Sequence, residues 1–83
     1  MDADRERKHL AKADRHIANA KATIEQQTKV IEKLVQEKHE TKVAVSLLHA
    51  MEHSLHAFEQ HRKTILELLE TLEALEKSGG SVR

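Results

Sequence analysis

The chain has 83 residues, with 14 Lys and Arg, 14 Asp and Glu, and a formal net charge of zero at pH 7. It contains one Phe but no Trp, Tyr, Cys or Pro. This composition excludes a disulfide-bonded scaffold and supplies neither the basic field nor the stacking aromatics that nucleic-acid binding requires. We therefore expect one small helical domain that binds no nucleic acid.

The first residues are mostly charged and lack the apolar core of a signal peptide. No run approaches the ~18 consecutive apolar residues of a membrane-spanning helix. We expect a soluble, cytoplasmic protein without a membrane partner.

The first predicted helix covers about residues 4–36. Asp2 or Asp4 suits its N-cap, because an acidic side chain accepts hydrogen bonds from the free N–H groups there. Large apolar residues recur at every seventh position (heptad position a), and a second row (position d) follows three residues later. Position a holds Leu10, Ile17, Ile24 and Ile31, and position d holds Ala13, Ala20, Gln27 and Leu34.

A turn is predicted at about residues 37–41. The stretch 36–42 contains no apolar residue, and the heptad phase of the first helix does not continue beyond it. Thr41 is the predicted N-cap of the next helix. A single unbroken helix is the alternative, since no Gly or Pro marks the turn.

The second predicted helix covers about residues 42–77. Gly79 or Gly80 suits a left-handed C-terminal cap, so residues 78–83 are expected to form a flexible tail. Position a of this helix holds Leu48, Leu55 and Leu69, and position d holds Met51, Phe58, Ile65 and Leu72.

Folding the chain at the turn predicts an all-α, antiparallel two-helix coiled-coil hairpin over residues 1–77. Small residues then face large ones, and opposite charges meet beside the seam, which helps to specify orientation. Arg62 interrupts the apolar stripe, and its side chain is expected to reach Asp14. The pairings expected from this register are Arg7 with Glu73, Lys21 with Glu59, Gln27 with Met51, Ala20 with Phe58, and His16 with His61.

A lone hairpin leaves several apolar side chains in water. A two-helix unit of this size has little core, so we expect a homodimer that forms a four-helix bundle. The predicted interface contains Val30, Leu47, Leu68 and Leu75 on one flank of the seam and Leu66 on the other.

The seven histidines are the candidates for chemistry. His49, His53 and His56 share one helix face, and His16 and His61 are expected to meet across the seam, so both sets are candidate metal ligands. Neither has the surrounding polar groups of a dedicated site, so we assign no metal, no cofactor and no catalytic residue. Glu6 and His9 match the Glu-x-x-His pattern of di-iron bundles, but the further ligands such a site needs are absent from the pattern.

Arg15-His16-Ile17-Ala18, His39-Glu40-Thr41 and His61-Arg62 resemble short uncharacterised bacterial helical-hairpin proteins over about residues 8–70. The resemblance implies a helical hairpin and no particular activity. In those proteins a Gly precedes the His-acid-Thr turn, whereas this chain has Lys38 there.

Two functions remain open from the sequence. The first is a non-enzymatic structural or protein-interaction module that self-associates through its Leu-rich helices and docks a further protein. The second is a sensor whose histidines couple pH or a transition metal to assembly.

Overall fold

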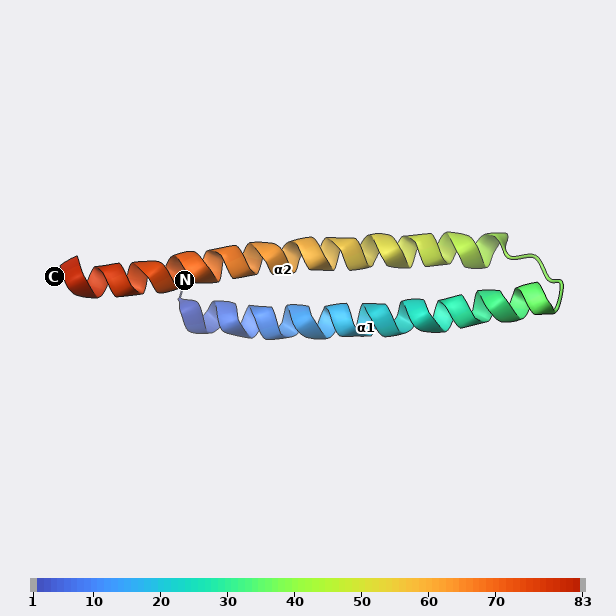
Figure 1. Cartoon of the computed structure of the whole chain (residues 1–83), viewed down its shortest axis with the longest axis horizontal. Coiled ribbons are helices and arrows are strands. Elements are labelled where there is room, and N and C mark those ends of the chain that lie inside the picture. Colours follow the sequence, from blue (N-terminus) through green and yellow to red (C-terminus); the bar gives the residue numbers. More distant parts are fainter. Residues whose placement is uncertain (1, 83) are drawn as a thin grey trace.

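The computed structural model describes residues 2–82, which form two antiparallel helices lying side by side (Figure 1). Helix α1 spans Ala3–Gln36 and α2 spans Lys42–Val82. The described chain contains no strand and measures 70 × 14 × 14 Å. The predicted all-α hairpin is therefore confirmed, and the unbroken helix is wrong.

Helix α1 begins with a side-chain cap. Asp2 has extended backbone angles, and its carboxylate accepts a hydrogen bond from the Arg5 backbone N–H at 2.7 Å. This bond favours the ionised carboxylate and lowers the pKa of Asp2 below its ordinary value. Of the two predicted caps, Asp2 is the one that the helix uses.

The end of α1 is a Schellman motif. The His39 N–H donates to the Leu34 carbonyl at 2.9 Å, and the Lys38 N–H donates to the Val35 carbonyl at 3.1 Å. These bonds require a left-handed residue at position 38, where the φ of Lys38 is 61°. Glycine adopts this conformation without the steric cost that a Cβ imposes. The turn therefore forms at residues 37–41 as predicted, with a lysine in the place that favours glycine.

Helix α2 begins directly after Thr41, whose carbonyl accepts the Val45 N–H at 2.8 Å. Its other end differs from the prediction. The helix does not stop at Lys77 but continues through Gly79 and Gly80 to Val82, so it ends later than predicted, and Arg83 lies outside the described residues. Glycine permits a left-handed cap but does not impose one, and a helix can pass through it at a cost of about 1 kcal/mol per residue.

The seam follows the predicted heptads. Every α1 side chain that is even partly shielded lies at position a or d. The pattern starts one heptad earlier than the apolar residues suggested, at Ala3 and Glu6, which are 3% and 5% exposed. The shielded α1 residues are Ala3, Glu6, Leu10, Ala13, Ile17, Ala20, Ile24, Gln27, Ile31 and Leu34.

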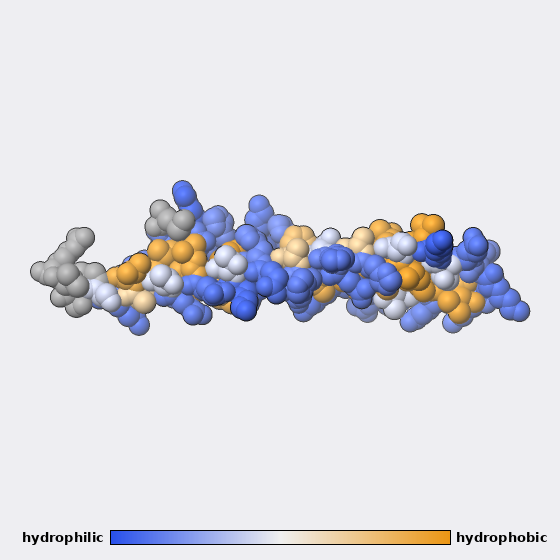
Figure 2. All heavy atoms as spheres, turned by 90° about the horizontal axis from the view of Figure 1, so that it is seen from above, coloured by the Kyte–Doolittle hydropathy of each residue, from blue (hydrophilic) through white to orange (hydrophobic). Residues whose placement is uncertain are grey.

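Burial is concentrated in the half of the hairpin that lies away from the turn. The apolar residues that are buried there include Ala13, Ile65 and Leu69, whereas in the turn-proximal half every described seam residue is only half-buried. Val43 and Val35, near the turn, are 83% and 61% exposed. One hairpin therefore shields its apolar residues only in part, and Figure 2 shows apolar patches at the surface at several places along the length of the molecule.

Two seam contacts were not among the expected pairings. The amide nitrogen of Gln27 donates to the Ala44 carbonyl at 2.8 Å, and its predicted pairing with Met51 stays a prediction. A half-buried amide needs a hydrogen-bond partner, which a backbone carbonyl supplies and a thioether supplies poorly. The Phe58 ring lies 5.3 Å from the His16 ring, centroid to centroid, and its packing against Ala20 stays a prediction.

Candidate functional site

The seam has two flanks, one on each side of the facing a and d residues. In an antiparallel pair, position e of one helix lies beside position e of the other, and g lies beside g. We call the e side the charged flank. Its members are Arg7, Asp14, Lys21, Thr28 and Val35 from α1 and Val45, Glu52, Glu59, Leu66 and Glu73 from α2.

The charged flank carries the ion pairs that the described residues form between the helices. Arg7 donates to the Glu73 carboxylate at 2.9 Å and to Asp4 at 2.6 Å. The pairing of Arg7 with Glu73 is as predicted, and it raises the pKa of Arg7 above its ordinary value. Because both side chains are about half exposed, the pair adds little stability but favours one orientation of the helices.

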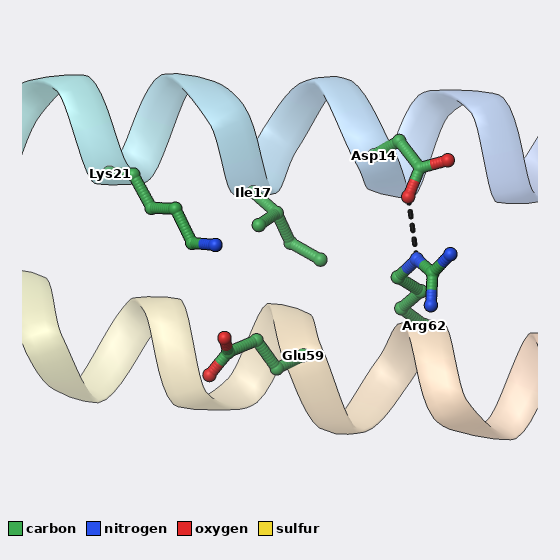
Figure 3. A pocket seen from close by; sticks show the side chains of 5 residues that line it. All are labelled: Asp14, Ile17, Lys21, Glu59 and Arg62. Carbon is green, nitrogen blue, oxygen red and sulfur yellow. Dashed lines mark hydrogen bonds and ion pairs between the residues drawn. The ribbon is translucent and has the colours of Figure 1, made fainter.

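A second pair joins Arg62 to the same flank. The Nε atom of Arg62 donates to Asp14 at 2.6 Å, which confirms the predicted reach of this side chain (Figure 3). Lys21 and Glu59, predicted to be opposite each other, project into the same shallow hollow, which Ile17 also lines. Arg62, the cation in the middle of the apolar seam positions of α2, is thus turned toward the charged flank.

The opposite side, which we call the uncharged flank, consists of the g positions. From residue 9 to residue 75, no g position of either helix holds Lys, Arg, Asp or Glu. Since the flanks come from the same two helices, the difference lies in the sequence and not in the fold. The members are His9, His16, Thr23 and Val30 from α1 and Leu47, Ser54, His61, Leu68 and Leu75 from α2.

His16 and His61 line one hollow on the uncharged flank, together with His9 and Phe58. Both histidines thus border the same side of the seam, and their direct pairing stays a prediction. His49, His53 and His56 are exposed on α2, away from this hollow. Within residues 2–82, no group of three or more His, Cys, Asp or Glu is arranged to hold a metal ion.

The predicted interface residues fall on both flanks, as expected. On the uncharged flank, Val30 and Leu47 are each 48% exposed, Leu75 is 60% exposed and Leu68 is half-buried. Leu66 is half-buried on the charged flank. Their role in an interface stays a prediction.

Helix α2 carries a second stripe of uncharged residues, which hydropathy alone does not reveal. Its residues are spaced alternately four and three apart, as in a coiled-coil seam, and none is Lys, Arg, Asp or Glu. All are exposed except Leu68, which is half-buried. The charged residues of α2 all lie elsewhere on the helix. The second stripe consists of Val43, Leu47, Ala50, Ser54, Ala57, His61, Thr64, Leu68, Thr71 and Leu75.

The two threonine hydroxyl groups on this stripe are already satisfied within the helix. The Thr64 hydroxyl donates to the Gln60 carbonyl at 3.2 Å, and the Thr71 hydroxyl donates to the Glu67 carbonyl at 3.0 Å. Such side chains can be covered by another apolar surface without losing a hydrogen bond. The second stripe therefore behaves as a more apolar surface than its composition suggests.

Glu6 is the other residue that the sequence reading undervalued. Its carboxylate is buried at position d and lies 3.3 Å from the Nδ1 atom of His9. An acidic residue close to the α1 N-terminus is favoured by the helix dipole, which offsets part of the cost of burial. Continuing the heptad backwards from Leu10 would have located it.

Comparisons with protein-family models, curated proteins and solved structures found no significant match. The resemblance to short bacterial hairpin proteins therefore stays a prediction. No helix among the described residues is both long enough and apolar enough to cross a bilayer.

Proposed function

We propose that this chain is a non-enzymatic protein-interaction module that self-associates through α2. The observation that carries the proposal is the second stripe, an uncharged row with coiled-coil spacing that the hairpin itself does not cover. Charged residues are the commonest feature of a solvated helix face, and α2 keeps all of its own away from this row.

The thin core supports the same proposal. None of the described apolar residues is completely buried, and Leu47 and Leu75 stay about half exposed or more. A second layer of helices would remove these side chains from water, and each fully buried Leu contributes about 1.5–3 kcal/mol. A four-helix bundle is the architecture that adds such a layer to a hairpin.

Sedimentation equilibrium of the full chain tests the proposal. At tens of micromolar chain we expect a dimer of twice the 9.5 kDa chain mass. This corresponds to a standard free energy of dimerisation of about −6 to −8 kcal/mol. Replacing Leu47, Leu68 and Leu75 with Gln should give a monomer. The matched control replaces His49, His53 and His56 with Gln, which leaves the second stripe intact and should leave the dimer intact. A wild-type chain that sediments only at 9.5 kDa would contradict the proposal.

A pH- or metal-responsive sensor is the second candidate function, and it has one observation in its favour. His16 and His61 come from different helices and line the same hollow. Two imidazoles that come within reach of one Zn²⁺ ion can share it, which would link the helices. Thermal unfolding of the wild type and of the His16→Gln/His61→Gln variant, with and without Zn²⁺, tests this function. Stabilisation by Zn²⁺ in the wild type alone supports it, and indifference of both proteins removes it.

A further inference from the structure

We infer that the second stripe is covered by α2 of a second copy running antiparallel, with the two-fold axis level with Ile17 and Glu59. This inference rests on the proposed self-association and adds the partner helix, its direction and its register. It places α2 against α2 and α1 against α1 in the bundle.

Steric complementarity of the second stripe with itself carries the inference. When two stripes run antiparallel about Glu59, Leu47 meets Thr71 of the second copy and Leu68 meets Ala50. At the centre, His61 meets Ala57 of the second copy. A large side chain therefore faces a smaller one in each of these layers, as dense packing between helices requires. A two-fold interface must be self-complementary in this way, because each residue pair occurs twice.

The outer layers also match in polarity. In this register Val43 near the turn meets Leu75 of the second copy, so two of the most exposed apolar side chains of the chain cover each other. They are 83% and 60% exposed in the single hairpin. The intermediate layer pairs Ser54 with Thr64, and the Thr64 hydroxyl is already bonded to its own helix.

Helix α1 gives an independent check on the position of the axis. We assume that α1 also contacts α1 of the second copy, through heptad positions c and g, which the second stripe occupies on α2. The register that best matches opposite charges then sets Lys33 beside Asp2 of the second copy. The same register sets the aliphatic stem of Arg5 beside Val30, and it centres α1 between His16 and Asn19, level with Ile17. Ile17 and Glu59 line one hollow and lie on facing turns of α1 and α2 (Figure 3). The centres deduced from the two helices therefore coincide, as a single two-fold axis demands.

The competing arrangement places α2 against α1 of the second copy. The apolar end of the second stripe then meets the polar start of α1, with Leu75 near Asp2 and Leu68 near His9. This packing leaves apolar side chains against polar ones, whereas the arrangement of α2 on α2 matches them with apolar partners. The two α2 helices of the dimer are antiparallel in the first arrangement and parallel in the competing one. A single intermolecular distance therefore distinguishes the two arrangements.

Spin labels on exposed α2 residues measure that distance in the full-length chain. The sequence has no Cys, so Gln60→Cys and Ala74→Cys each provide a single labelling position, and both residues are exposed and outside the second stripe. We expect the two Gln60 labels of a dimer to be separated mainly by the width of two helices whose axes are ~10 Å apart. The two Ala74 labels should be separated by about 45 Å along the axis, at 1.5 Å per residue.

The outcomes separate the inference from the proposed function. A dimer whose Ala74 labels are as close together as its Gln60 labels would overturn the antiparallel arrangement of α2 on α2 but leave self-association standing. A chain that is monomeric by sedimentation would overturn both. As a control, the same labels in the variant with Gln at Leu47, Leu68 and Leu75 should lose the intermolecular distance.

Discussion

The charged and uncharged flanks are built from the same two helices and border the same seam, yet their surfaces differ in kind. The charged flank pairs Arg7 with Glu73 and Arg62 with Asp14 across the helices. The uncharged flank offers Leu47, Leu68 and Leu75 instead. The fold therefore does not distinguish the flanks, and the choice of side chains at e and g positions does.

This difference indicates a division of roles between the flanks. Exposed ion pairs add little stability, but like charges across the seam would disfavour the wrong register, so they help to specify how the two helices align. A row without charges can be removed from water without the cost of desolvating an ion. One flank is thus suited to solvent and the other to a partner, and the following predictions test that division.

The largest expected effect comes from placing a charge on the uncharged flank. Leu68→Glu should weaken self-association about 100-fold or more, because two carboxylates per dimer would be buried without partners. Ser46→Glu is the matched control, since Ser46 is exposed on α2 outside the second stripe and should have little effect. Sedimentation equilibrium of the two variants provides the comparison. Equal dimerisation constants would show that Leu68 does not lie in the interface.

Removing core volume should have the next largest effect. Ile65 is 4% exposed, so Ile65→Ala should lower the free energy of unfolding by about 2–5 kcal/mol. Leu66, the next residue, is only half-buried on the charged flank, and Leu66→Ala should cost clearly less. Urea unfolding at one fixed chain concentration gives both values, since association also contributes to stability. A larger loss for Leu66→Ala would place a partner on the charged flank instead.

A substitution in the turn should stabilise the whole hairpin without favouring either flank. Lys38→Gly removes the Cβ from a residue with φ of 61° and should raise the free energy of unfolding by about 1 kcal/mol. Lys38→Ala retains the Cβ and serves as the control that should bring no gain. Thermal unfolding of both variants tests the expectation. A destabilised Lys38→Gly protein would mean that the left-handed turn does not form in solution.

The smallest effect is expected on the charged flank. Arg62 and Asp14 are 38% and 52% exposed, so a double-mutant cycle should give a coupling of about 0.2–1 kcal/mol that decreases with added salt. Arg62→Met preserves the side-chain stem, and Asp14→Asn removes the charge. A coupling that is large and insensitive to salt would indicate that this flank is covered rather than solvated.

Most of the hairpin could be predicted because seam positions are determined by spacing alone. The heptad phase gave the two helices, the turn, and the pairing of Arg7 with Glu73. The end of α2 could not be predicted in this way, since Gly79 and Gly80 are compatible with both a helix and a cap. The partner of Gln27 was also missed, because a backbone carbonyl leaves no trace in a side-chain pattern.

The candidate surface was predicted only in part. Leu47, Leu68 and Leu75 stand out by hydropathy, but Ala50, Ala57 and the threonines between them do not. Their significance comes from the absence of charge along a row with coiled-coil spacing, which becomes visible once the seam is known. The hydroxyl bonds of Thr64 and Thr71, which make the row easier to cover, depend on helix geometry and require the structure.

If a second copy covers the uncharged flank, solvent does not reach that flank when the chain associates. Leu75 on that flank and Val35 on the charged flank provide a matched test, because they are 60% and 61% exposed in the single hairpin. Methyl NMR with a soluble paramagnetic agent measures how closely solvent approaches each side chain. We predict that the methyl groups of Leu75 are protected at concentrations where the chain associates, while those of Val35 stay accessible. Equal accessibility of Leu75 and Val35 under those conditions would contradict the account.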